Sequence, residues 1–544
     1  MIGRIAHRIA KLLVPKLIRS LESPEELQTK ILRTILQKNA GTFFGKKHHF
    51  TTIRSIESYQ EKVPLQSYSE LVPYLNMINN GQKKILTNAN PIWWLQTSGT
   101  TGVPKYIPFT KRGLRAFIIS SARLLGFAED SLEFARVLDG RVIIYAASAR
   151  TGIKNNVPVG FISGVSAAYL SNLITNRILI QPSKRVRRCT DLNERLWLFA
   201  KEIVPKDVRM IIGVTPLVLT LVKSIYEEFP ERIENQFKNS KIGELIASIR
   251  KENENRIPVN EIWPNLKVFI HSGVHVEPYM QYIRKSMGNV ELREMYLGSE
   301  GAYAIQVRGD LPPILSSDIY FFEFISKSDL DKSNPRRLLV NEIKKNQVYE
   351  LIITNWDGLY AYRIGDLVKV YETNPVCIRV HGRTKTTVNL TGEKIVELHV
   401  SKAIQHATDV TGTQVRDYSL IGYIENSVGK YVLVIEFIDQ NVEPIILKEF
   451  IKAFDGKIRD LNPDWAVTRD SGALMEPEIF QVKSGVMNEY VRRRAAQISD
   501  NNLLITTQIK PPYLSGDPNL LREFQNINNE VNYSALKDGA SKTS

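Results

Sequence analysis

Residues 93–105 read WWLQTSGTTGVPK, a short apolar run that passes directly into a loop of glycines and hydroxyl side chains. Glycines let a backbone approach a polyphosphate closely, amides and hydroxyls donate to its oxygens, and Lys105 adds a positive charge. The Walker pattern is not met, because Gly99 and Gly102 are too close together and Pro104 precedes the lysine. Composition alone therefore leaves two interpretations open, an ordinary turn or a phosphate loop of another type.

Three later segments favour the phosphate loop. Residues 296–300 read YLGSE, residues 362–366 read YRIGD, and residues 381–385 read HGRTK. Together with the glycine loop, and in this order, they resemble the signature motifs of the adenylate-forming superfamily, which includes acyl-CoA synthetases, peptide-synthetase adenylation domains and luciferase.

Within that superfamily the chain most resembles the auxin-responsive Gretchen Hagen family of acyl acid amido synthetases, known from plants and with microbial relatives. The resemblance runs roughly from residue 20 to residue 515. It rests on residues 42–48 (TFFGKKH), 63–65 (VPL), 67–68 (SY), 157–160 (VPVG), 461–465 (LNPDW), 476–479 (EPEI) and 508–510 (QIK). Two segments depart from the plant pattern, TTG at 100–102 and GEK at 392–394, so the plant hormone substrates are not carried over.

The apolar pattern and the resemblance predict the same α/β organisation. Apolar runs at 142–145, 208–212 and 266–270 alternate with helix-period stretches such as 217–229, and a β-rich portion follows from residue 349. We expect a large adenylate-forming domain over residues 1–400, with sheets and flanking helices. A small, mobile α+β lid domain is expected over 401–525, with strands at 418–423 and 431–437, a helix over 443–461 and another after Val486. A flexible polar tail is expected over 526–544.

The resemblance implies a ligase that forms C–N bonds, and the low cysteine count fits a reducing, cytoplasmic setting. ATP and a carboxylic acid would give an acyl-adenylate and pyrophosphate, and an amine, expected to be an amino acid, would then take the acyl group as an amide and release AMP. The cofactor set is ATP with Mg²⁺. An acyl-CoA ligase or another adenylate-forming acyltransferase remains the alternative.

Adenylation brings two anions together, so the site needs a metal and fixed cations where charge accumulates. Glu300 supplies a hard oxygen ligand of the kind Mg²⁺ uses. Tyr296 offers an aromatic face to adenine, and Asp366 can accept hydrogen bonds from both ribose hydroxyls. By resemblance, Lys394 and Lys510 are the catalytic cations, with Lys510 on a lid that engages in only one half-reaction.

The remaining site residues are predicted from the same motifs. Residues expected to bind ATP are Ser98, Gly99, Thr100, Thr101, Gly102, Lys105, Ser272, Gly273, Tyr296, Gly298, Ser299, Asp366 and Arg383. Residues expected to line the acyl pocket are Val214, Thr215 and Leu217. Individually, these apolar positions are equally compatible with core packing.

The chain carries 72 basic and 57 acidic residues, a formal charge of +15 that fits nucleic acid, an anionic membrane or an anionic substrate. The basic runs 184–188 and 492–494 lack interleaved aromatics, so we expect solvated faces and no nucleic-acid partner. Cys189 and Cys377 are too few for a disulfide framework. We expect no membrane-spanning segment, and we expect a monomer.

The first twenty residues predict an amphipathic helix. Its spaced apolar residues are Ile2, Ile5, Ile9, Leu12 and Leu13, and basic residues interrupt any run that a signal peptide would need. We expect this helix to pack on the body of the protein. Contact with a membrane surface is the alternative.

Overall fold

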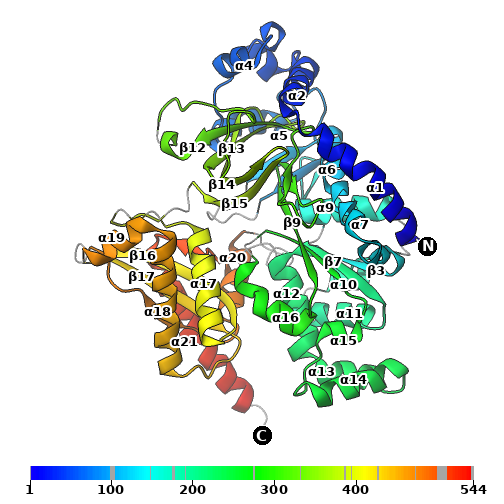
Figure 1. The fold of residues 1–544 in the computed structure, drawn as a ribbon, viewed down its shortest axis with the longest axis vertical. Helices are drawn as coiled ribbons and strands as arrows, with labels where there is room; N and C mark the ends of the chain where they lie inside the picture. Colours follow the sequence, from blue (N-terminus) through cyan, green and yellow to red (C-terminus); the bar gives the residue numbers. More distant parts are fainter. Residues whose placement is uncertain are drawn as a thin grey trace. The chain divides into compact units, whose positions relative to one another are not determined.

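The structure is a computed structural model that describes residues 2–97, 105–146, 149–173, 178–189, 191–273, 276–330, 332–384, 388–391, 393, 395–425, 428–471, 473–498 and 511–540. The chain divides into two compact units, drawn by element in Figure 1. The described part of unit 1 falls within Met1–Thr97, Pro104–Val274 and Ser286–Val380, and that of unit 2 within His275–Lys285 and His381–Ser544. Together they confirm the predicted α/β class.

Unit 1 is built on a mixed sheet of eleven strands within the described residues, in the order β12-β13-β14-β15-β11-β10-β9-β8-β7-β3-β6. The strands are β3 (Arg141–Tyr145), β6 (Leu179–Ile180), β7 (Val208–Val214), β8 (Val268–Ser272), β9 (Glu291–Gly298), β10 (Gly301–Ile305), β11 (Ile314–Leu315), β12 (Phe321–Ser326), β13 (Val348–Thr354), β14 (Tyr362–Thr373) and β15 (Val376–Arg383). Within the part of the sheet ordered β9-β8-β7-β3-β6, adjacent strands pair in parallel, whereas β9 pairs antiparallel with β10. The predicted strands at 142–145, 208–212 and 266–270 and the β-rich portion from residue 349 are confirmed.

A second sheet of unit 1 carries the glycine-loop strand. Its described strands, in the order β2-β1-β5-β4, are β2 (Tyr106–Phe109), β1 (Trp93–Gln96), β5 (Val157–Gly160) and β4 (Gly152–Lys154). Because β1 pairs antiparallel with β2, Gln96 lies opposite Tyr106, and the residues between them connect two adjacent strands.

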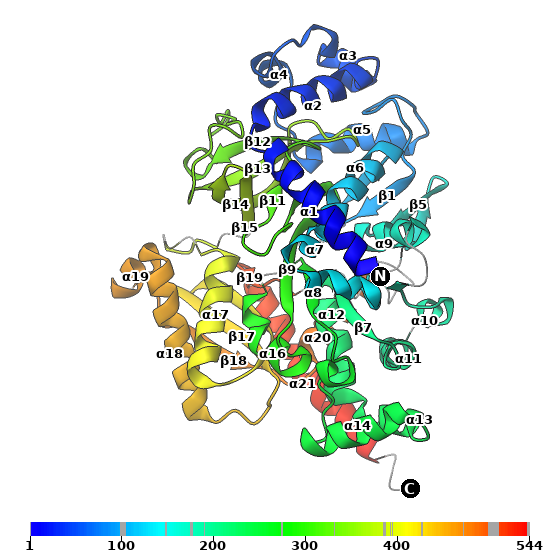
Figure 2. The same cartoon turned by 45° about the vertical axis from the view of Figure 1, so that its right-hand side comes forward.

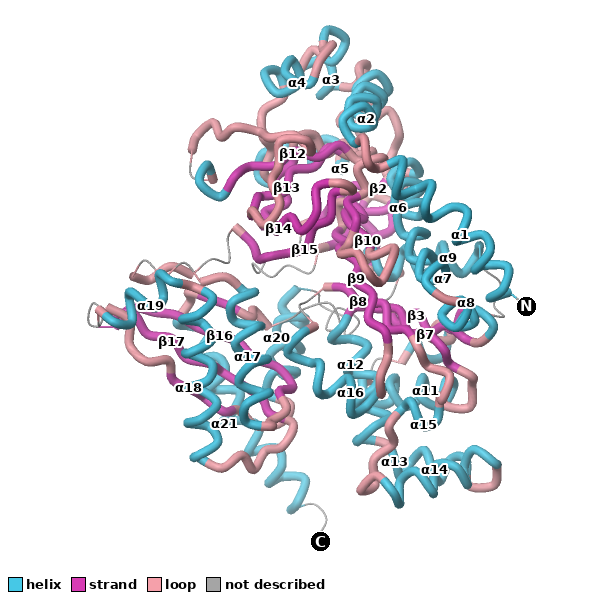
Figure 3. Tube along the Cα trace, in the orientation of Figure 1, coloured by secondary structure: helices cyan, strands magenta, loops and turns pink. Residues whose placement is uncertain are grey.

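Helices flank these sheets, as Figure 3 shows in cyan against the magenta strands. They are α1 (Ile2–Ser20), α2 (Pro24–Asn39), α3 (Phe43–Lys47), α4 (Ile56–Lys62), α5 (Tyr68–Asn79), α6 (Lys111–Ser121), α7 (Phe127–Asp130), α8 (Leu132–Ala135), α9 (Ile162–Leu173), α10 (Lys184–Arg188), α11 (Leu192–Ile203), α12 (Thr215–Lys223), α13 (Pro230–Phe237), α14 (Lys241–Glu252) and α15 (Val259–Ile262). Helix α16 (Met280–Met287) belongs mostly to unit 2. No helix in the described ranges has the length and hydropathy needed to cross a membrane.

The segment TFFGKKH, on which part of the family resemblance rests, has a structural role. Thr42 caps α3, because its side chain accepts a hydrogen bond from the Gly45 amide at 2.9 Å. Phe44 is fully buried and stacks on Tyr360, with ring centroids 4.9 Å apart. His48 bonds through Nδ1 to the carbonyl oxygen of Lys62 at 2.9 Å. These contacts tie the N-terminal helices to the core of unit 1.

Helix α1 packs on unit 1, but not through the side chains that the sequence suggested. Its buried residues are Gly3, Ala10 and Val14, and it lies against α7, α8 and the short helix η3 (Arg136–Asp139). A β-carbon on Gly3 would lie 2.6 Å from the carbonyl oxygen of Ala135, so this contact is too close for large side chains. The larger apolar residues are instead exposed, namely Ile2, Ile5, Ile9, Leu12 and Leu13. The expected packing of this helix on the body of the protein is confirmed, although the apolar residues that marked it in the sequence are exposed.

Unit 2 is an α+β module. Its described sheet, in the order β18-β17-β16-β19, comprises β18 (Glu478–Gln481), β17 (Val428–Phe437), β16 (Val415–Glu425) and β19 (Leu514–Ser515). Its helices include α17 (Glu397–Thr411), α18 (Pro444–Leu461), α19 (Pro463–Asp470), α20 (Val486–Ile498) and α21 (Pro518–Ala540). The strands predicted at 418–423 and 431–437 and the helices predicted over 443–461 and after Val486 lie within these elements.

Residues 526–540 differ from the expected tail, because α21 continues through them (Figure 2). Phe524 and Ile527 are fully buried in a cluster with Tyr490 of α20, and the Tyr490 and Phe524 rings lie 4.9 Å apart. The apolar contacts order a segment whose composition is otherwise polar.

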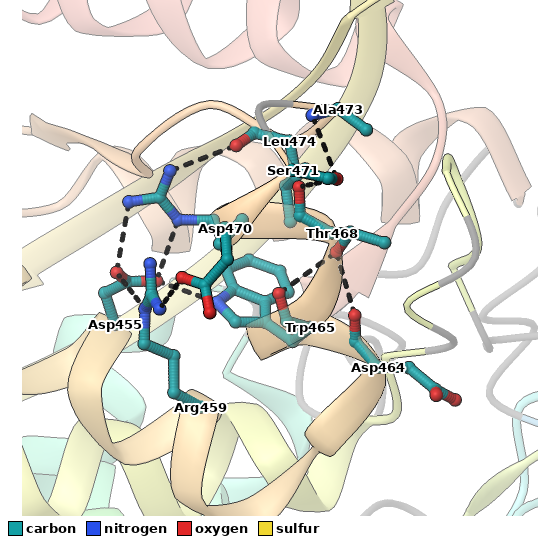
Figure 4. A network of polar contacts seen from close by, with 10 residues as sticks. Asp455, Arg459, Asp464, Trp465, Thr468, Asp470, Ser471, Ala473 and Leu474 are labelled. Carbon is teal, nitrogen blue, oxygen red and sulfur yellow. Dashed lines mark hydrogen bonds and ion pairs between the residues drawn. The ribbon is translucent and has the colours of Figure 1, made fainter.

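A buried carboxylate joins α18 to α19, as Figure 4 shows. Asp455 accepts a 2.7 Å hydrogen bond from the Trp465 indole and pairs with the guanidinium groups of Arg459 and Arg469, each at 3.2 Å. Arg459 also pairs with Asp470 at 2.7 Å. One carboxylate thus serves three donors and fixes the turn between two helices.

Candidate active site

The carboxyl ends of three parallel strands meet at one edge of the large sheet. In the register of β7, β8 and β9, Val214 lies opposite Ser272, and Ser272 lies opposite Met295, the residue before Tyr296. Thr215 is fully buried and donates its hydroxyl to the carbonyl oxygen of Ser272 at 3.1 Å. This edge is where open α/β sheets bind ligands.

Tyr296 and Asp366 form a buried hydrogen-bonded pair. The Tyr296 hydroxyl on β9 donates to Oδ2 of Asp366 on β14 at 2.7 Å, and both residues are less than a tenth exposed. The Tyr296 ring also lies 4.6 Å from the Tyr303 ring, centroid to centroid. The aromatic residue and the acid expected to contact nucleoside therefore have fixed relative positions.

Glu300 sits in the turn between β9 and β10 and is only 8% exposed. Tyr303 donates to its Oε2 at 3.1 Å, and the Asn355 side-chain amide donates to its carbonyl oxygen at 2.7 Å. Burial raises the pKa of the Glu300 carboxyl, the charge of Asp366 raises it further, and the charge of Lys105 opposes both effects. The carboxylates of Glu300 and Asp366 and the ammonium group of Lys105 therefore interact electrostatically at a site where Glu300 is buried.

Gly298 allows this turn to pack tightly. A β-carbon at this position would lie 2.5 Å from the Tyr303 hydroxyl and 3.0 Å from Oε2 of Glu300. Any larger residue would displace the Tyr303–Glu300 pair, so the glycine of the YLGSE motif is required by a close approach.

The two ends of the glycine loop are fastened beside this turn. The Thr97 amide donates to the Lys105 carbonyl oxygen at 3.0 Å, and the Lys105 amide donates to the Thr97 hydroxyl at 3.2 Å. Ser299 makes a long 3.5 Å hydrogen bond to the Gln96 carbonyl oxygen. The Lys105 ammonium lies 5.5 Å from the centre of the Tyr68 ring. The loop thus starts and ends next to Glu300.

The donor set can be tested for Mg²⁺. Among the described residues no group of three or more His, Cys, Asp or Glu side chains could enclose a metal ion. Magnesium, however, is usually held by one or two carboxylates together with water and substrate phosphates. Glu300, with Asp366 close enough to act on its pKa, fits that sparse arrangement.

The chain matches three models of one family over most of its length. The GH3 family N-terminal domain matches residues 14–292, the GH3 family central domain residues 314–383, and the GH3 family C-terminal domain residues 398–519. The chain belongs to the GH3 family. The family resemblance seen in the sequence motifs is thereby confirmed.

Relatives within the GH3 family match nearly end to end. The chain is 23% identical to a jasmonoyl–L-amino acid synthetase (JAR4) of Nicotiana attenuata, over 91% of this chain and 92% of that protein. It is 25% identical to the indole-3-acetic acid-amido synthetase GH3.10 of Arabidopsis thaliana, over 87% and 90%.

Solved structures share the fold. The GH3.15 acyl acid amido synthetase in complex with 2,4-DB has a TM-score of 0.75 at 18% identity, covering 94% of this chain and 95% of that one. A 2-hydroxyisobutyryl-CoA ligase in the postadenylation state has a TM-score of 0.57 at 13% identity, covering 93% and 92%. The fold of this chain is thus shared with an acyl acid amido synthetase and with an acyl-CoA ligase.

In this GH3 family chain the predicted residues fall into three groups. Unit 1 brings together Lys105, Tyr296, Gly298, Ser299, Glu300 and Asp366, with Val214, Thr215, Leu217, Ser272 and Gly273 at the strand ends beside them or just beyond. Arg383 is exposed at the end of β15, in unit 2. Ser98, Gly99, Thr100, Thr101, Gly102, Lys394 and Lys510 lie outside the described residues.

The motifs did not reveal several residues that hold the site. Tyr303 and Asn355 orient Glu300, yet neither belongs to a quoted motif. The only signal in the sequence was position, since Tyr303 follows Glu300 by three residues and Asn355 directly follows β13. Thr215 was expected to line the acyl pocket. Its hydroxyl donates to the Ser272 carbonyl oxygen and so joins α12 to β8.

In unit 2, Glu393 of the GEK segment is an internal anchor. Its side chain is fully buried and accepts hydrogen bonds from the amides of Leu390 and Thr391 at 2.7 and 2.8 Å and from the Tyr431 hydroxyl at 2.5 Å. Asn462 donates to the Glu393 carbonyl oxygen at 2.5 Å. Burial raises the pKa of the Glu393 carboxyl. The hydrogen bonds that Tyr431, Leu390 and Thr391 donate to the carboxylate outweigh the effect of burial and hold the pKa below its usual value.

Proposed function

We propose that this chain is an ATP-dependent acyl acid amido synthetase. The observation that carries the proposal is the buried cluster of Tyr296, Asp366, Tyr303 and Glu300 beside Lys105, in a chain of the GH3 family. A cluster of two carboxylates, a cation and an aromatic face suits a nucleotide with its charge-balancing ion.

In the first half-reaction a carboxylate oxygen of the acid bonds to the α-phosphorus of ATP, and the bond from that phosphorus to the pyrophosphate oxygen breaks. Asp366 accepts hydrogen bonds from the ribose, and Tyr296 supports the adenine and holds Asp366 in place. Lys105 and the glycine loop offset phosphate charge. Glu300 would hold Mg²⁺, which when bound neutralises phosphate charge.

In the second half-reaction the nitrogen of an amine bonds to the acyl carbon, the bond from that carbon to the AMP oxygen breaks, and the ammonium proton passes to solvent. We assign the amine to an amino acid on the strength of the jasmonoyl–L-amino acid synthetase to which the chain is similar. AMP is a good leaving group, so no dedicated acid is required at this step.

We further propose that Lys394 and Lys510 stabilise the negative charge that develops on the phosphate. In this proposal residues 1–400 hold ATP and the acyl group, and residues 401–525 act as a lid. Anchoring of Glu393 by Tyr431 and Asn462 supports a fixed backbone directly before Lys394. Removal of one preorganised charge-stabilising group costs about 100- to 1,000-fold in rate.

The test measures acid-dependent pyrophosphate release over a panel of aryl, indolyl and aliphatic acids, and then identifies products by mass spectrometry with mixed amino acids. Coenzyme A is offered in a parallel reaction, because acyl-CoA formation is the alternative. Lys510→Ala should lose acid-dependent ATP–pyrophosphate exchange while ATP binding changes little. An exchange rate equal to that of the parent would remove Lys510 from the mechanism, and a thioester product without any amide would overturn the amide proposal.

A further inference from the structure

Helix α1 presents a large apolar stripe to solvent. Ile2, Ile5, Ile9, Leu12 and Leu13 are between 48% and 64% exposed. Among the described residues fifteen large apolar side chains are at least 44% exposed, and five of them lie within residues 2–13 of α1. Single exposed apolar residues are ordinary on a protein surface, but a contiguous group marks an interaction surface.

The helix is already folded and fixed before it meets any partner. Its opposite face packs on α7 and α8, the Gly3 amide donates to Oδ1 of Asp139 at 2.9 Å, and His7 bonds through Nδ1 to the Ala128 carbonyl oxygen at 2.6 Å. The exposed stripe therefore needs no further ordering to make a contact, which keeps the entropic cost of binding low.

A basic stripe borders the apolar one. At 3.6 residues per turn, Arg4, Arg8, Lys11 and Arg19 fall along one side of the apolar residues, and Lys16 lies near their C-terminal end. Residues 1–20 contain no acidic side chain. Within the part of the chain that the structure describes, these five basic residues are exposed and make no ion pair.

Another basic run of the chain behaves differently. Arg492 and Arg493 pair with Glu489 at 2.6 and 2.9 Å, and Arg494 pairs with Glu523 at 3.2 Å. The charges of Arg492, Arg493 and Arg494 are therefore balanced by acidic residues of unit 2, whereas the basic residues of α1 make no ion pair within the described part of the chain.

We propose that the outer face of α1 binds the surface of an anionic lipid bilayer. A surface helix of this type buries its apolar stripe at the boundary of headgroups and acyl chains, while its basic residues approach anionic headgroups. A second copy of this chain is a poorer occupant, because pairing two such faces would bring together ten cations with no acidic residue between them. The family N-terminal domain match begins at residue 14, so all five residues of the exposed apolar stripe lie outside it.

The experiment uses the full chain and vesicle flotation. Vesicles of phosphatidylcholine alone are compared with vesicles of phosphatidylcholine and phosphatidylserine, at low and at high salt. We expect binding to the anionic vesicles that weakens at high salt and is weak on the neutral vesicles. Each basic residue near such a surface contributes roughly fivefold to partition, so the variant Arg4→Gln/Arg8→Gln/Lys11→Gln should bind about a hundredfold more weakly.

A second variant tests the apolar stripe. Leu12→Gln/Leu13→Gln keeps good helix formers at exposed positions and should lower vesicle binding at least about tenfold. Matched controls lie on α14 and just before it. Lys238→Gln/Lys241→Gln/Lys251→Gln removes the same charge, with Lys238 directly after α13 and the other two lysines on α14, and Leu245→Gln removes an exposed leucine of α14. The controls should bind like the parent.

Three results would overturn the proposal. The parent could bind neutral and anionic vesicles alike, or the α14 controls could lose as much binding as the α1 variants. In the third, the α1 variants would change the sedimentation state and leave vesicle binding unchanged, which would mean that a second copy covers the face. Acid-dependent pyrophosphate release without vesicles should be the same in all of these variants, so this test is separate from that of the proposed activity.

Discussion

Tyr296 and Asp366 come from strands that are separated by three others in the sheet order, yet the hydroxyl of Tyr296 donates to the carboxylate of Asp366 across 2.7 Å. Tyr296→Phe keeps the ring and removes the donor, so the carboxylate loses a bond worth about 1.5–3 kcal/mol. We expect the KM for ATP to rise about ten- to a hundredfold in steady-state pyrophosphate release. Tyr371→Phe, on β14 as well, is the control and should leave the KM unchanged.

Gly298→Ala tests the close approach in the YLGSE turn. The new β-carbon, 2.5 Å from the Tyr303 hydroxyl, must displace the Tyr303–Glu300 pair by about 1 Å, and a misplacement of that size costs about a hundredfold in rate. Gly456→Ala on α18 meets nothing within 4 Å and should instead stabilise the chain by about 0.5–1 kcal/mol. Equal activity of the two variants would show that the turn tolerates the shift.

Asp357 should make stability depend on pH. Burial raises the pKa of its carboxyl from 3.8 to about 7, despite a 2.7 Å hydrogen bond from the Thr110 amide. Between these pH values the folded chain keeps a proton that the unfolded chain releases, so stability falls as pH rises and the full cost, about 1–4 kcal/mol, is present above pH 7.

Asp357→Asn should remove this cost. Chemical unfolding at about pH 5 and about pH 8 should show the variant gaining stability over the parent at the higher pH. Asp464→Asn, at an exposed position, should show no such trend. A constant difference between Asp357→Asn and the parent would mean that Asp357 is ionised in the folded chain throughout this range.

The Asp455 carboxylate should contribute strongly to the stability of unit 2. Asp455→Ala leaves the Trp465 indole and the guanidinium groups of Arg459 and Arg469 without their shared acceptor. We expect a loss of about 2–4 kcal/mol in chemical unfolding monitored by tryptophan fluorescence. Asp464→Ala should stay within about 0.5 kcal/mol of the parent.

The two cysteines should react differently with a thiol reagent. Burial raises the pKa of the Cys377 thiol to about 12, whereas Cys189 is partly exposed. One thiol should therefore react with the reagent in the folded chain and two in denaturant. Cys189→Ser should abolish the reaction of the folded chain. Rapid reaction of two thiols without denaturant would contradict the burial of Cys377.

The sequence predicted the fold class and the candidate site to different depths. Apolar runs marked β3, β7 and β8 because buried parallel strands have few alternatives, and the motifs marked Tyr296, Glu300 and Asp366. Periodicity could have marked α21, where Leu520, Phe524, Ile527 and Val531 recur at helical spacing, but the polar residues between them hid it.

Hydrogen-bond partners that are brought together only by tertiary packing could not be predicted from the sequence. Nothing local to Glu300 specifies that Asn355 will hold its carbonyl group, and nothing local to Asp455 specifies three donors. For α1, the sequence showed an amphipathic helix but not which side faces inward, because the choice is made by the fit of Gly3 and Ala10 against residues more than a hundred positions away.

That distance also sets an order of events during synthesis. Helix α1 leaves the ribosome before the α7, α8 and η3 segments on which it packs, and those segments end at Asp139. At a translation rate of about 5–20 residues per second, α1 waits several seconds for its docking partner. During that interval both of its faces are open to chaperones, and folding of the N-terminal region can finish only when the chain has grown past residue 139.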